Sequence, residues 1–295
     1  MDEHYLELLI DGYTIIPDVL SPQEVEEARG LFYDWKSTIP NHDEIHEQIN
    51  PHGIYKFHEA GHQRHAWFIR TRPKVQAMFK YLYDTDDLVS SFDGSCFISS
   101  TCTRMDKKPW THTDQAPNVE GFRCYQSFVS LTNNKHRTLV VYEGTHDYHH
   151  QYFQERDMLG ETKNWQLINH DTLGELEGKK RVLEVPAGAL VIWDSRVFHQ
   201  NQYGYTNSQT SPPGEERIVQ YVCFLPRGDR KNTQSQKTKR RKYFDDRRTT
   251  SHWPYPIHVN GLQPQTYGNA RLVVPYGELI PPDLTGLEEE IEKLI

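Results

Sequence analysis

The stretch Trp110-Thr111-His112-Thr113-Asp114 is the feature that most constrains what this chain can become. Residues i and i+2 of an extended segment point to the same side, so His112 and Asp114 can hold one ion together. His199, in the downstream stretch Trp193–His199, could complete a face of three ligands. Two imidazoles and one carboxylate with open positions form a ligand set of non-haem iron sites. Taken alone the spacing is weak evidence, because this chain has 16 histidines and a chance His-x-Asp more often has a structural or surface role.

Composition indicates a folded protein of 295 residues, with 12% aromatic residues and a mean hydropathy of −0.78. The net charge of −8 argues against a general affinity for nucleic acid. The four scattered cysteines form no CxxC pair, which is typical of buried, reduced thiols. An acidic N-terminus is unlike a signal peptide, and no apolar run is long enough to span a membrane. We therefore expect a cytoplasmic location, with the nucleus as the alternative.

The first third of the chain is predicted to be mainly helical. A capping box, Ser21-Pro22-Gln23-Glu24, opens one helix, and Pro73 opens another. Between them, residues 41–66 hold six histidines: His42, His46, His52, His58, His62 and His65. Their spacing fits no compact metal motif, so we interpret this stretch as a polar loop at the surface or facing a substrate, with a metal cluster as the alternative.

From residue 94 onward the pattern favours β-strands. Short runs rich in Val, Phe, Tyr and Ile are separated by turns. The expected strands are 95–104, 122–131, 138–143, 181–185, 189–193 and 218–225. They predict a mainly β fold with peripheral helices, a jelly-roll barrel with the N-terminal helices packed outside it. The three candidate ligands would then lie at the mouth of the barrel, which is a usual place for a ligand site.

The last part of the chain differs in composition. Residues 227–248 carry ten basic and three acidic residues, a net charge of +7. They could form a solvated loop, a nuclear-import signal at Lys239–Lys242, or a contact for an anionic substrate or partner. Residues 249–260 are aromatic and contain prolines, and we expect them to pack on the barrel or to rim the site. We therefore divide the chain into a barrel domain, 1–226, and an extension, 227–295, that packs on it.

Arg217 opens an alternating strand after an expected loop at 202–216. If Arg217 points inward it needs an anionic partner, because a buried unpaired charge is costly. The forked guanidinium suits a carboxylate.

These residues occur in an order that resembles the phytanoyl-CoA dioxygenase family. The matching features are Gly12-Tyr13 with the following Ile-Pro-x-Val-Leu-Ser pattern, His112-x-Asp114, Gly144-Thr145-His146, Pro186-Ala187-Gly188 with His199, and Arg217. They span about residues 10–226. The loop before Arg217 is longer than is usual in the family, and residues 227–295 have no counterpart in the pattern.

The resemblance implies a double-stranded β-helix that uses Fe(II), 2-oxoglutarate and O2. It places the metal triad on His112, Asp114 and His199, and it makes Arg217 the anchor of the distal carboxylate of 2-oxoglutarate. Asn201 can touch that carboxylate, and Gln126 and Arg104 are candidates for the carboxylate at the other end. The implied products are succinate, CO2 and an oxidised small molecule. Asp114 favours hydroxylation, with desaturation or ring closure as alternatives.

Two other classes of function remain open from the residues alone. A zinc hydrolase could use the same three ligands, although it would leave Arg217 without a role and would want a general base that the sequence does not show. A non-catalytic barrel could act as a binding module, for nucleic acid or another anionic partner, through residues 227–248.

Overall fold

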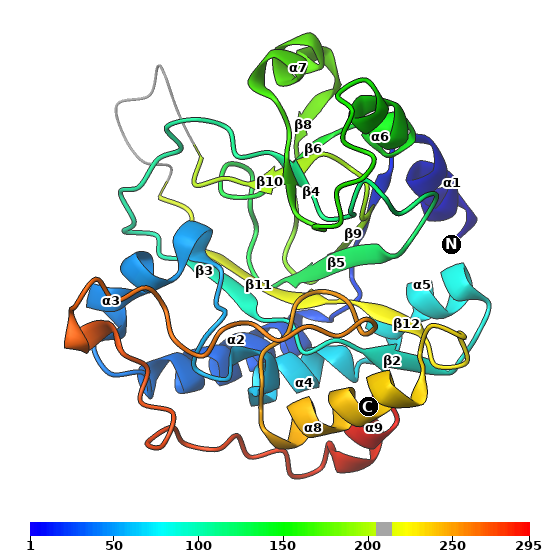
Figure 1. The fold of residues 1–295 in the computed structure, drawn as a ribbon. Helices are drawn as coiled ribbons and strands as arrows, with labels where there is room; N and C mark the ends of the chain where they lie inside the picture. Colours follow the sequence, from blue (N-terminus) through cyan, green and yellow to red (C-terminus); the bar gives the residue numbers. More distant parts are fainter. Residues whose placement is uncertain (205–213) are drawn as a thin grey trace.

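The computed structural model describes residues 1–204 and 214–295, and part of the loop expected at 202–216 lies outside these residues. Two five-stranded antiparallel sheets form its centre (Figure 1). The first has the strand order β1-β9-β5-β11-β3 and the second has the order β7-β4-β10-β6-β8. A two-stranded sheet, β12-β2, lies beside them. The prediction of β-sheets with surrounding helices is confirmed, but the fold is mixed α/β with antiparallel sheets rather than mainly β, and a closed barrel is not seen among the described residues.

The strands are short, and most of them are buried. The first sheet contains β1 (Tyr13–Ile16), β9 (Leu190–Asp194), β5 (Tyr125–Ser130), β11 (Arg217–Val222) and β3 (Ser95–Ile98). The second contains β7 (Gln166–Leu167), β4 (His112–Thr113), β10 (His199–Asn201), β6 (Leu139–Tyr142) and β8 (Lys180–Val182). The small sheet pairs β12 (Phe224–Pro226) with β2 (Leu88–Ser90).

Helices and 3-10 turns fill the chain between these strands and after them. The α-helices are α1 (Asp2–Ile10), α2 (Pro22–Ser37), α3 (His42–Ile49), α4 (Arg64–Arg70), α5 (Pro73–Tyr83), α6 (Thr145–Gln154), α7 (His170–Glu175), α8 (Gln234–Asp245) and α9 (Glu288–Glu292). The 3-10 turns are η1 (Pro51–Gly53), η2 (Ala60–His62), η3 (Glu177–Lys179) and η4 (Ala270–Leu272). The predicted capping box is present at the start of α2, where Ser21 and Glu24 bond each other's backbone N–H.

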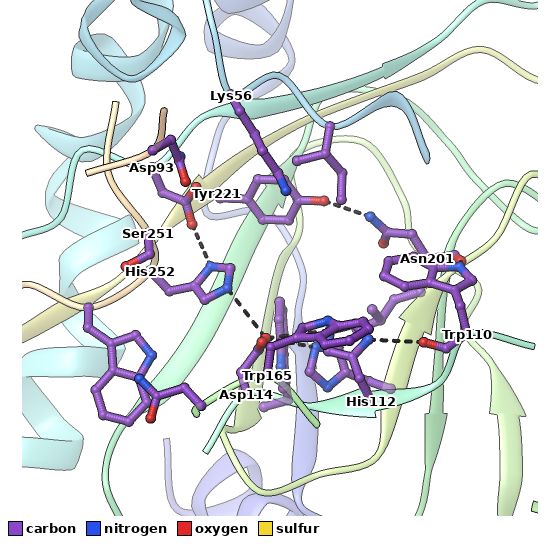
Figure 2. A pocket seen from close by; sticks show the side chains of 17 residues that line it. Lys56, Asp93, Trp110, His112, Asp114, Trp165, Asn201, Tyr221, Ser251 and His252 are labelled. Atoms are coloured by element: carbon purple, nitrogen blue, oxygen red, sulfur yellow. Dashed lines mark hydrogen bonds and ion pairs between the residues drawn. The ribbon is translucent and has the colours of Figure 1, made fainter. Parts of the chain in front are cut away.

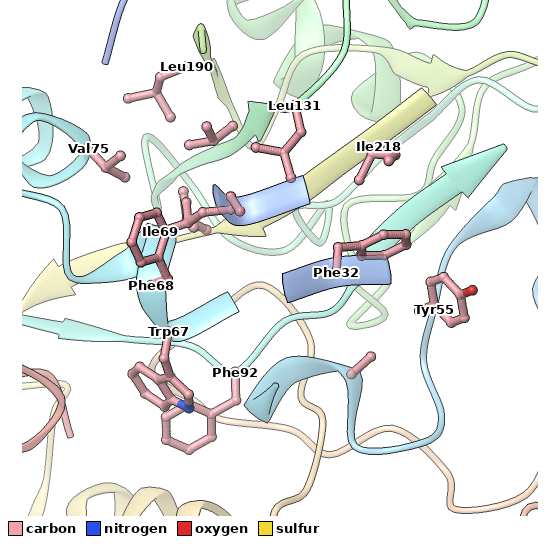
Figure 3. Close-up of a cluster of buried hydrophobic side chains, with 14 of the residues drawn as sticks. Phe32, Tyr55, Trp67, Phe68, Ile69, Val75, Phe92, Leu131, Leu190 and Ile218 are labelled. Carbon is pink, nitrogen blue, oxygen red and sulfur yellow. The ribbon is translucent and has the colours of Figure 1, made fainter. Parts of the chain in front are cut away.

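The first sheet separates two hydrophobic clusters, because alternate residues of each strand point to opposite faces. Leu190 and Ile192 pack in one cluster with residues of α2, α4 and α5 (Figure 3), whereas Val191 and Trp193 pack in another with residues of the second sheet. In Figure 1, α2 and α4 accordingly lie on one side of the first sheet and the second sheet lies on the other. The space between the sheets is therefore reached by inward side chains from both.

The histidine-rich stretch 41–66 differs from its predicted character as a surface or substrate-facing loop. It contains α3, two 3-10 turns and the start of α4. Five of its six histidines are buried: His42, His46, His58, His62 and His65. All of these except His58 have ring contacts with aromatic side chains; His65, for example, lies edge-on to Phe32 with ring centroids 5.2 Å apart. Histidine spacing alone could not show this, because the burial comes from contacts with α2 and the first sheet.

Residues 227–295 also contribute to the core, although they lie outside the two large sheets. Ile257, Leu272 and Leu287 belong to the same cluster as α2 and α4. The small sheet ends at Pro226, next to the predicted boundary of the extension. All four cysteines are buried and free, as predicted. Within the described chain, no helix has the length and apolar character needed to cross a membrane.

Candidate metal centre

Two neighbouring strands of the second sheet bring the predicted metal ligands together. β4 and β10 pair antiparallel with His112 directly opposite His199, and Asp114 follows β4 immediately. The backbone N–H of Asp114 and the hydroxyl of Thr113 both donate to the carbonyl of Ser195, at 3.2 and 3.0 Å, which ties this corner to the turn before β10. One ligand atom from each of the three candidates lies within 4.8 Å of the others.

Backbone contacts orient both imidazoles for metal binding. The Nδ1 atom of His112 lies 3.2 Å from the carbonyl of Trp110, and that of His199 lies 2.9 Å from the carbonyl of Val197. A carbonyl only accepts, so each Nδ1 carries the proton and each Nε2 offers a lone pair. The Nε2 atoms face Asp114 Oδ2 at 3.6 and 3.3 Å. This is the tautomer that two metal-binding histidines need.

Electrostatics favour neutral imidazole beside an ionised carboxylate. Burial lowers the pKa of His112, and the nearby charge of Asp114 only partly opposes this effect. Burial would raise the pKa of Asp114, but the electrostatic interactions with His252 and His112 and the hydrogen bonds around the carboxylate hold this pKa well below its usual value. His112 and Asp114 therefore favour the protonation states that a divalent cation prefers.

Gln126, a candidate contact for one carboxylate of 2-oxoglutarate, points inward from β5. In the structure its side chain contacts the triad directly. Its Nε2 donates to Asp114 Oδ2 at 3.0 Å, and its Oε1 accepts from Trp193 Nε1 at 3.1 Å. Both ends of the amide are thus engaged, which makes Gln126 a support for Asp114 in this structure. Arg104 pairs with Glu47 at 3.0 Å and, like Gln126 and Arg217, is not among the residues that line the triad cavity.

Arg217 lies on β11 with its side chain between the two sheets, on the same face as Val219 and Tyr221. Its side chain is 1% exposed, and its guanidinium carbon lies 5.3 Å from the centre of the Phe128 ring. Neither terminal nitrogen has a hydrogen-bond partner within the described residues. A buried guanidinium with two free nitrogens fits a carboxylate ligand, because that ligand would satisfy both the charge and the fork.

A cavity of about 420 Å³ opens beside the triad (Figure 2). Asn201 and Tyr221 line it together, joined by a 2.7 Å hydrogen bond from Asn201 Nδ2 to the Tyr221 hydroxyl. The rest of the lining combines tryptophans and aliphatic residues with polar side chains, three of which come from the C-terminal extension. The tryptophans are Trp110, Trp165, Trp193 and Trp253, and the polar residues include Lys56, Asp93, Asn164, Ser251, His252 and Asn260.

Ser251, His252, Trp253 and Asn260 come from the aromatic, proline-containing segment that was expected to pack on the barrel or rim the site. The sequence pattern placed this segment near the site but did not single out His252 or Asp93. His252 Nε2 lies 3.4 Å from Asp114 Oδ2, and its Nδ1 lies 2.6 Å from Asp93 Oδ2. Burial disfavours the charged imidazolium, but the Asp93 and Asp114 carboxylates raise the pKa of His252 well above its ordinary value.

Residues 227–248 lie apart from this cavity, since none of them lines it. Several of their basic side chains have structural partners. Arg227 pairs with Asp87 at 2.8 Å, Arg247 pairs with Glu59 at 2.7 Å, and Arg241 pairs with Glu292. Arg240 is fully buried and donates to the Asn232 side chain and the Pro254 carbonyl. The predicted contact with an anionic partner stays a prediction for the exposed lysines of α8.

Comparisons with known proteins identify one protein of similar sequence and several solved structures of similar fold. No family model matches the chain. The Ava biosynthesis cluster protein O of Aspergillus versicolor is 25% identical over 239 residues, which are 74% of this chain and 75% of that protein. At this identity the relative does not by itself define a family.

Two solved structures share the fold. HygX from Streptomyces hygroscopicus, solved with nickel and 2-oxoglutarate bound, has a TM-score of 0.52 and 13% identity, with 77% of this chain and 87% of HygX covered. The GlcNAc Inducible Gene 2 protein from Candida albicans has a TM-score of 0.55 and 14% identity, with 75% of this chain and 62% of that protein covered. These TM-scores establish a shared fold. At identities this low, the chemistry has to be argued from the site.

Proposed function

We propose that this chain is an Fe(II)- and 2-oxoglutarate-dependent oxygenase that oxidises a small organic molecule. The observation that carries the proposal is one constellation: a buried His-Asp-His triad and, on the facing sheet, a buried arginine whose two terminal nitrogens have no hydrogen-bond partner among the described residues. A shared fold with HygX, which holds nickel and 2-oxoglutarate, supports the same reading. The finer assignment to the phytanoyl-CoA dioxygenase family rests on the motif order in the sequence.

Each residue has a distinct task in the proposed site. His112, Asp114 and His199 would hold Fe(II) on one face and leave the remaining positions open. Arg217 would bind the distal carboxylate of 2-oxoglutarate through its two free nitrogens, and Asn201 and Tyr221 would line the space between that carboxylate and the metal. When bound, these groups supply an oxidation that consumes O2 and 2-oxoglutarate and releases succinate and CO2. Hydroxylation is the outcome that we propose for the substrate.

The cavity supports a small-molecule substrate with substantial apolar surface. Its volume of about 420 Å³ lies within the range of sites for small organic ligands. The tryptophans of the lining offer apolar contacts, while Lys56 and Ser251 offer polar contacts. A zinc hydrolase could use the same triad, but it would leave Arg217 as a buried charge without a partner in the described chain.

The test is formation of succinate and CO2 from 2-oxoglutarate that depends on both Fe(II) and O2. Without its substrate the wild-type protein should show slow uncoupled turnover, and metabolite extracts should contain a molecule that accelerates it. His199→Ala should abolish turnover because it removes one of three ligands, whereas His150→Ala, at an exposed histidine on α6, should keep it. Undiminished turnover in His199→Ala, or hydrolysis without O2 consumption by the zinc form, would contradict the proposal.

A further inference from the structure

His252 comes from the C-terminal extension, more than 50 residues after the last triad ligand, and it reaches the triad between two carboxylates. Figure 2 shows its ring between Asp93 and Asp114. The Nδ1 atom lies 2.6 Å from Asp93 Oδ2, and the Nε2 atom lies 3.4 Å from Asp114 Oδ2. Its side chain is 34% exposed, because it faces the cavity, so it is not an ordinary core histidine.

The segment that carries His252 is anchored beside Asp93. The backbone N–H of Thr250 donates to the Phe92 carbonyl, and the Phe92 N–H donates to the Thr250 hydroxyl, both at 2.9 Å. Ser251 N–H donates to the His258 carbonyl at 2.9 Å, which folds the segment back on itself. Because Phe92 precedes Asp93 and Thr250 lies two residues before His252, this pairing sets the carboxylate and the imidazole side by side.

Four side-chain nitrogens converge on one oxygen of Asp114. Gln126 Nε2 lies 3.0 Å from Oδ2, His199 Nε2 lies at 3.3 Å, His252 Nε2 lies at 3.4 Å and His112 Nε2 lies at 3.6 Å. The two triad histidines would use their Nε2 lone pairs for the metal. Gln126 and His252 would then remain as the contacts that hold the carboxylate, one from the first sheet and one from the extension.

We propose that His252, delivered by the C-terminal extension and held by Asp93, is a positioning residue that fixes the Asp114 carboxylate toward the metal. The inference rests on the proposed function, because it assumes that a metal binds at the triad. Asp93 holds the His252 ring through Nδ1 at 2.6 Å, so the Nε2 atom faces Asp114 and the pair adds a directed contact to the carboxylate. His252 is not a fourth ligand, since only His112, Asp114 and His199 in the described chain have ligand atoms within 4.8 Å of one another.

Co(II) provides the test, because its visible absorption reports coordination geometry directly and needs no substrate. Supporting contacts to metal ligands typically contribute about 10- to 100-fold in metal affinity. His252→Ala should therefore weaken Co(II) binding by roughly 10-fold or more and should change the Co(II) absorption bands. His252→Gln keeps an N–H donor without a charge, so it should recover part of the affinity and the wild-type spectrum. His258→Ala, at an exposed histidine of the same segment, is the matched control and should match wild type.

The Asp93→Asn variant tests the relay from Asp93 through His252. If Asp93 acts by holding His252, the double variant Asp93→Asn/His252→Ala should bind Co(II) no more weakly than His252→Ala alone. If the losses of Co(II) affinity in the two single variants add up in the double variant, Asp93 does not act through His252. Wild-type or tighter Co(II) binding in His252→Ala, with an unchanged spectrum and a thermal unfolding midpoint near that of wild type, would overturn the positioning role. A wild-type protein that binds no Co(II) would instead refute the proposed function and this inference together.

Discussion

The guanidinium of Arg217 is the most informative single group in the molecule. It is fully buried, yet both terminal nitrogens lack a partner in the described chain. A protein does not ordinarily hold such a charge for stability, because its desolvation is not compensated. The same arrangement is useful if a dianionic ligand binds there, since the ligand then supplies the missing partner. Ligand binding and the stability of the folded state are therefore linked at this residue.

Arg217 gives the first prediction at this scale. Arg217→Ala should weaken 2-oxoglutarate binding by about 2–5 kcal/mol, roughly 30-fold to several thousand-fold, because the distal carboxylate would be buried without its partner. Arg217→Lys should retain only part of the affinity for 2-oxoglutarate, since an ammonium group cannot make the forked contact. Isothermal titration of the anaerobic metal-loaded protein measures this affinity. Co(II) affinity serves as the control and should change little, and a 2-oxoglutarate affinity within twofold of wild type in Arg217→Ala would rule out the anchoring role.

A second prediction concerns the free protein without metal or 2-oxoglutarate. Arg217→Met replaces the unpaired charge by an apolar side chain of similar length, so the variant should be at least as stable as wild type to urea. It should also lose the thermal stabilisation that 2-oxoglutarate gives to the metal-loaded wild-type protein. A large loss of stability in the free variant would mean that Arg217 has a structural partner already.

The residues differ in how far the sequence could predict them. His112 and Asp114 were predictable because strand alternation puts residues i and i+2 on one side, and a local pattern carries that information. The need of Arg217 for an anionic partner was predictable, because a charged residue that opens an apolar alternating strand is costly to bury alone. His252 was not predicted, because its place depends on a backbone pairing between Phe92 and Thr250, about 160 residues apart. Gln126 was predicted to face inward, but its contact with Asp114 depends on packing between the two sheets.

At the scale of elements, helix α8 shows how composition can mislead. Its sequence is strongly basic, which favours a solvated segment or an anion-binding surface. The structure divides these charges into two groups. Arg240 is buried against Asn232 and the Pro254 carbonyl, whereas Lys237, Lys239 and Lys242 are exposed. Charge counting cannot make this distinction, because it depends on which face of the helix the aromatic segment 249–260 covers.

The two neighbours Lys239 and Arg240 therefore give a matched pair for a third prediction. Arg240→Ala should lower the free energy of unfolding by about 1–3 kcal/mol, because buried acceptors on Asn232 and Pro254 lose their donor. Lys239→Ala should change it by less than about 0.5 kcal/mol, as expected for an exposed side chain. Urea unfolding of both variants measures the difference. Equal effects would show that Arg240 is not buried as described here.

The whole molecule combines β-sheets that carry the candidate metal triad with a helical layer rich in buried, uncharged histidine. Burial lowers the pKa of His42, His62 and His65 to about 3, and that of His46 and His58 to about 4. These side chains all belong to the stretch from α3 to the start of α4. In the unfolded chain the same groups titrate near pH 6.5. The folded and unfolded states therefore bind different numbers of protons over a defined range of pH.

The sign of the last prediction follows from that difference. Between about pH 6.5 and pH 4 the unfolded chain binds more protons than the folded one, so the free energy of unfolding falls as the pH is lowered. Each fully buried histidine contributes a slope of up to about 1.4 kcal/mol per pH unit, and the stability is fully present above about pH 7. Urea unfolding of the chelator-treated protein across this range should show a steep loss. His62→Gln removes one titrating side chain and keeps a donor for the Arg248 carbonyl. This variant should reduce the pH dependence of the free energy of unfolding by about the contribution of one buried histidine. His258→Gln, at an exposed position, should leave the pH dependence of stability unchanged. A wild-type free energy of unfolding that stays constant from pH 7 to pH 5 would show that the buried histidines are already accessible to protons in the folded protein.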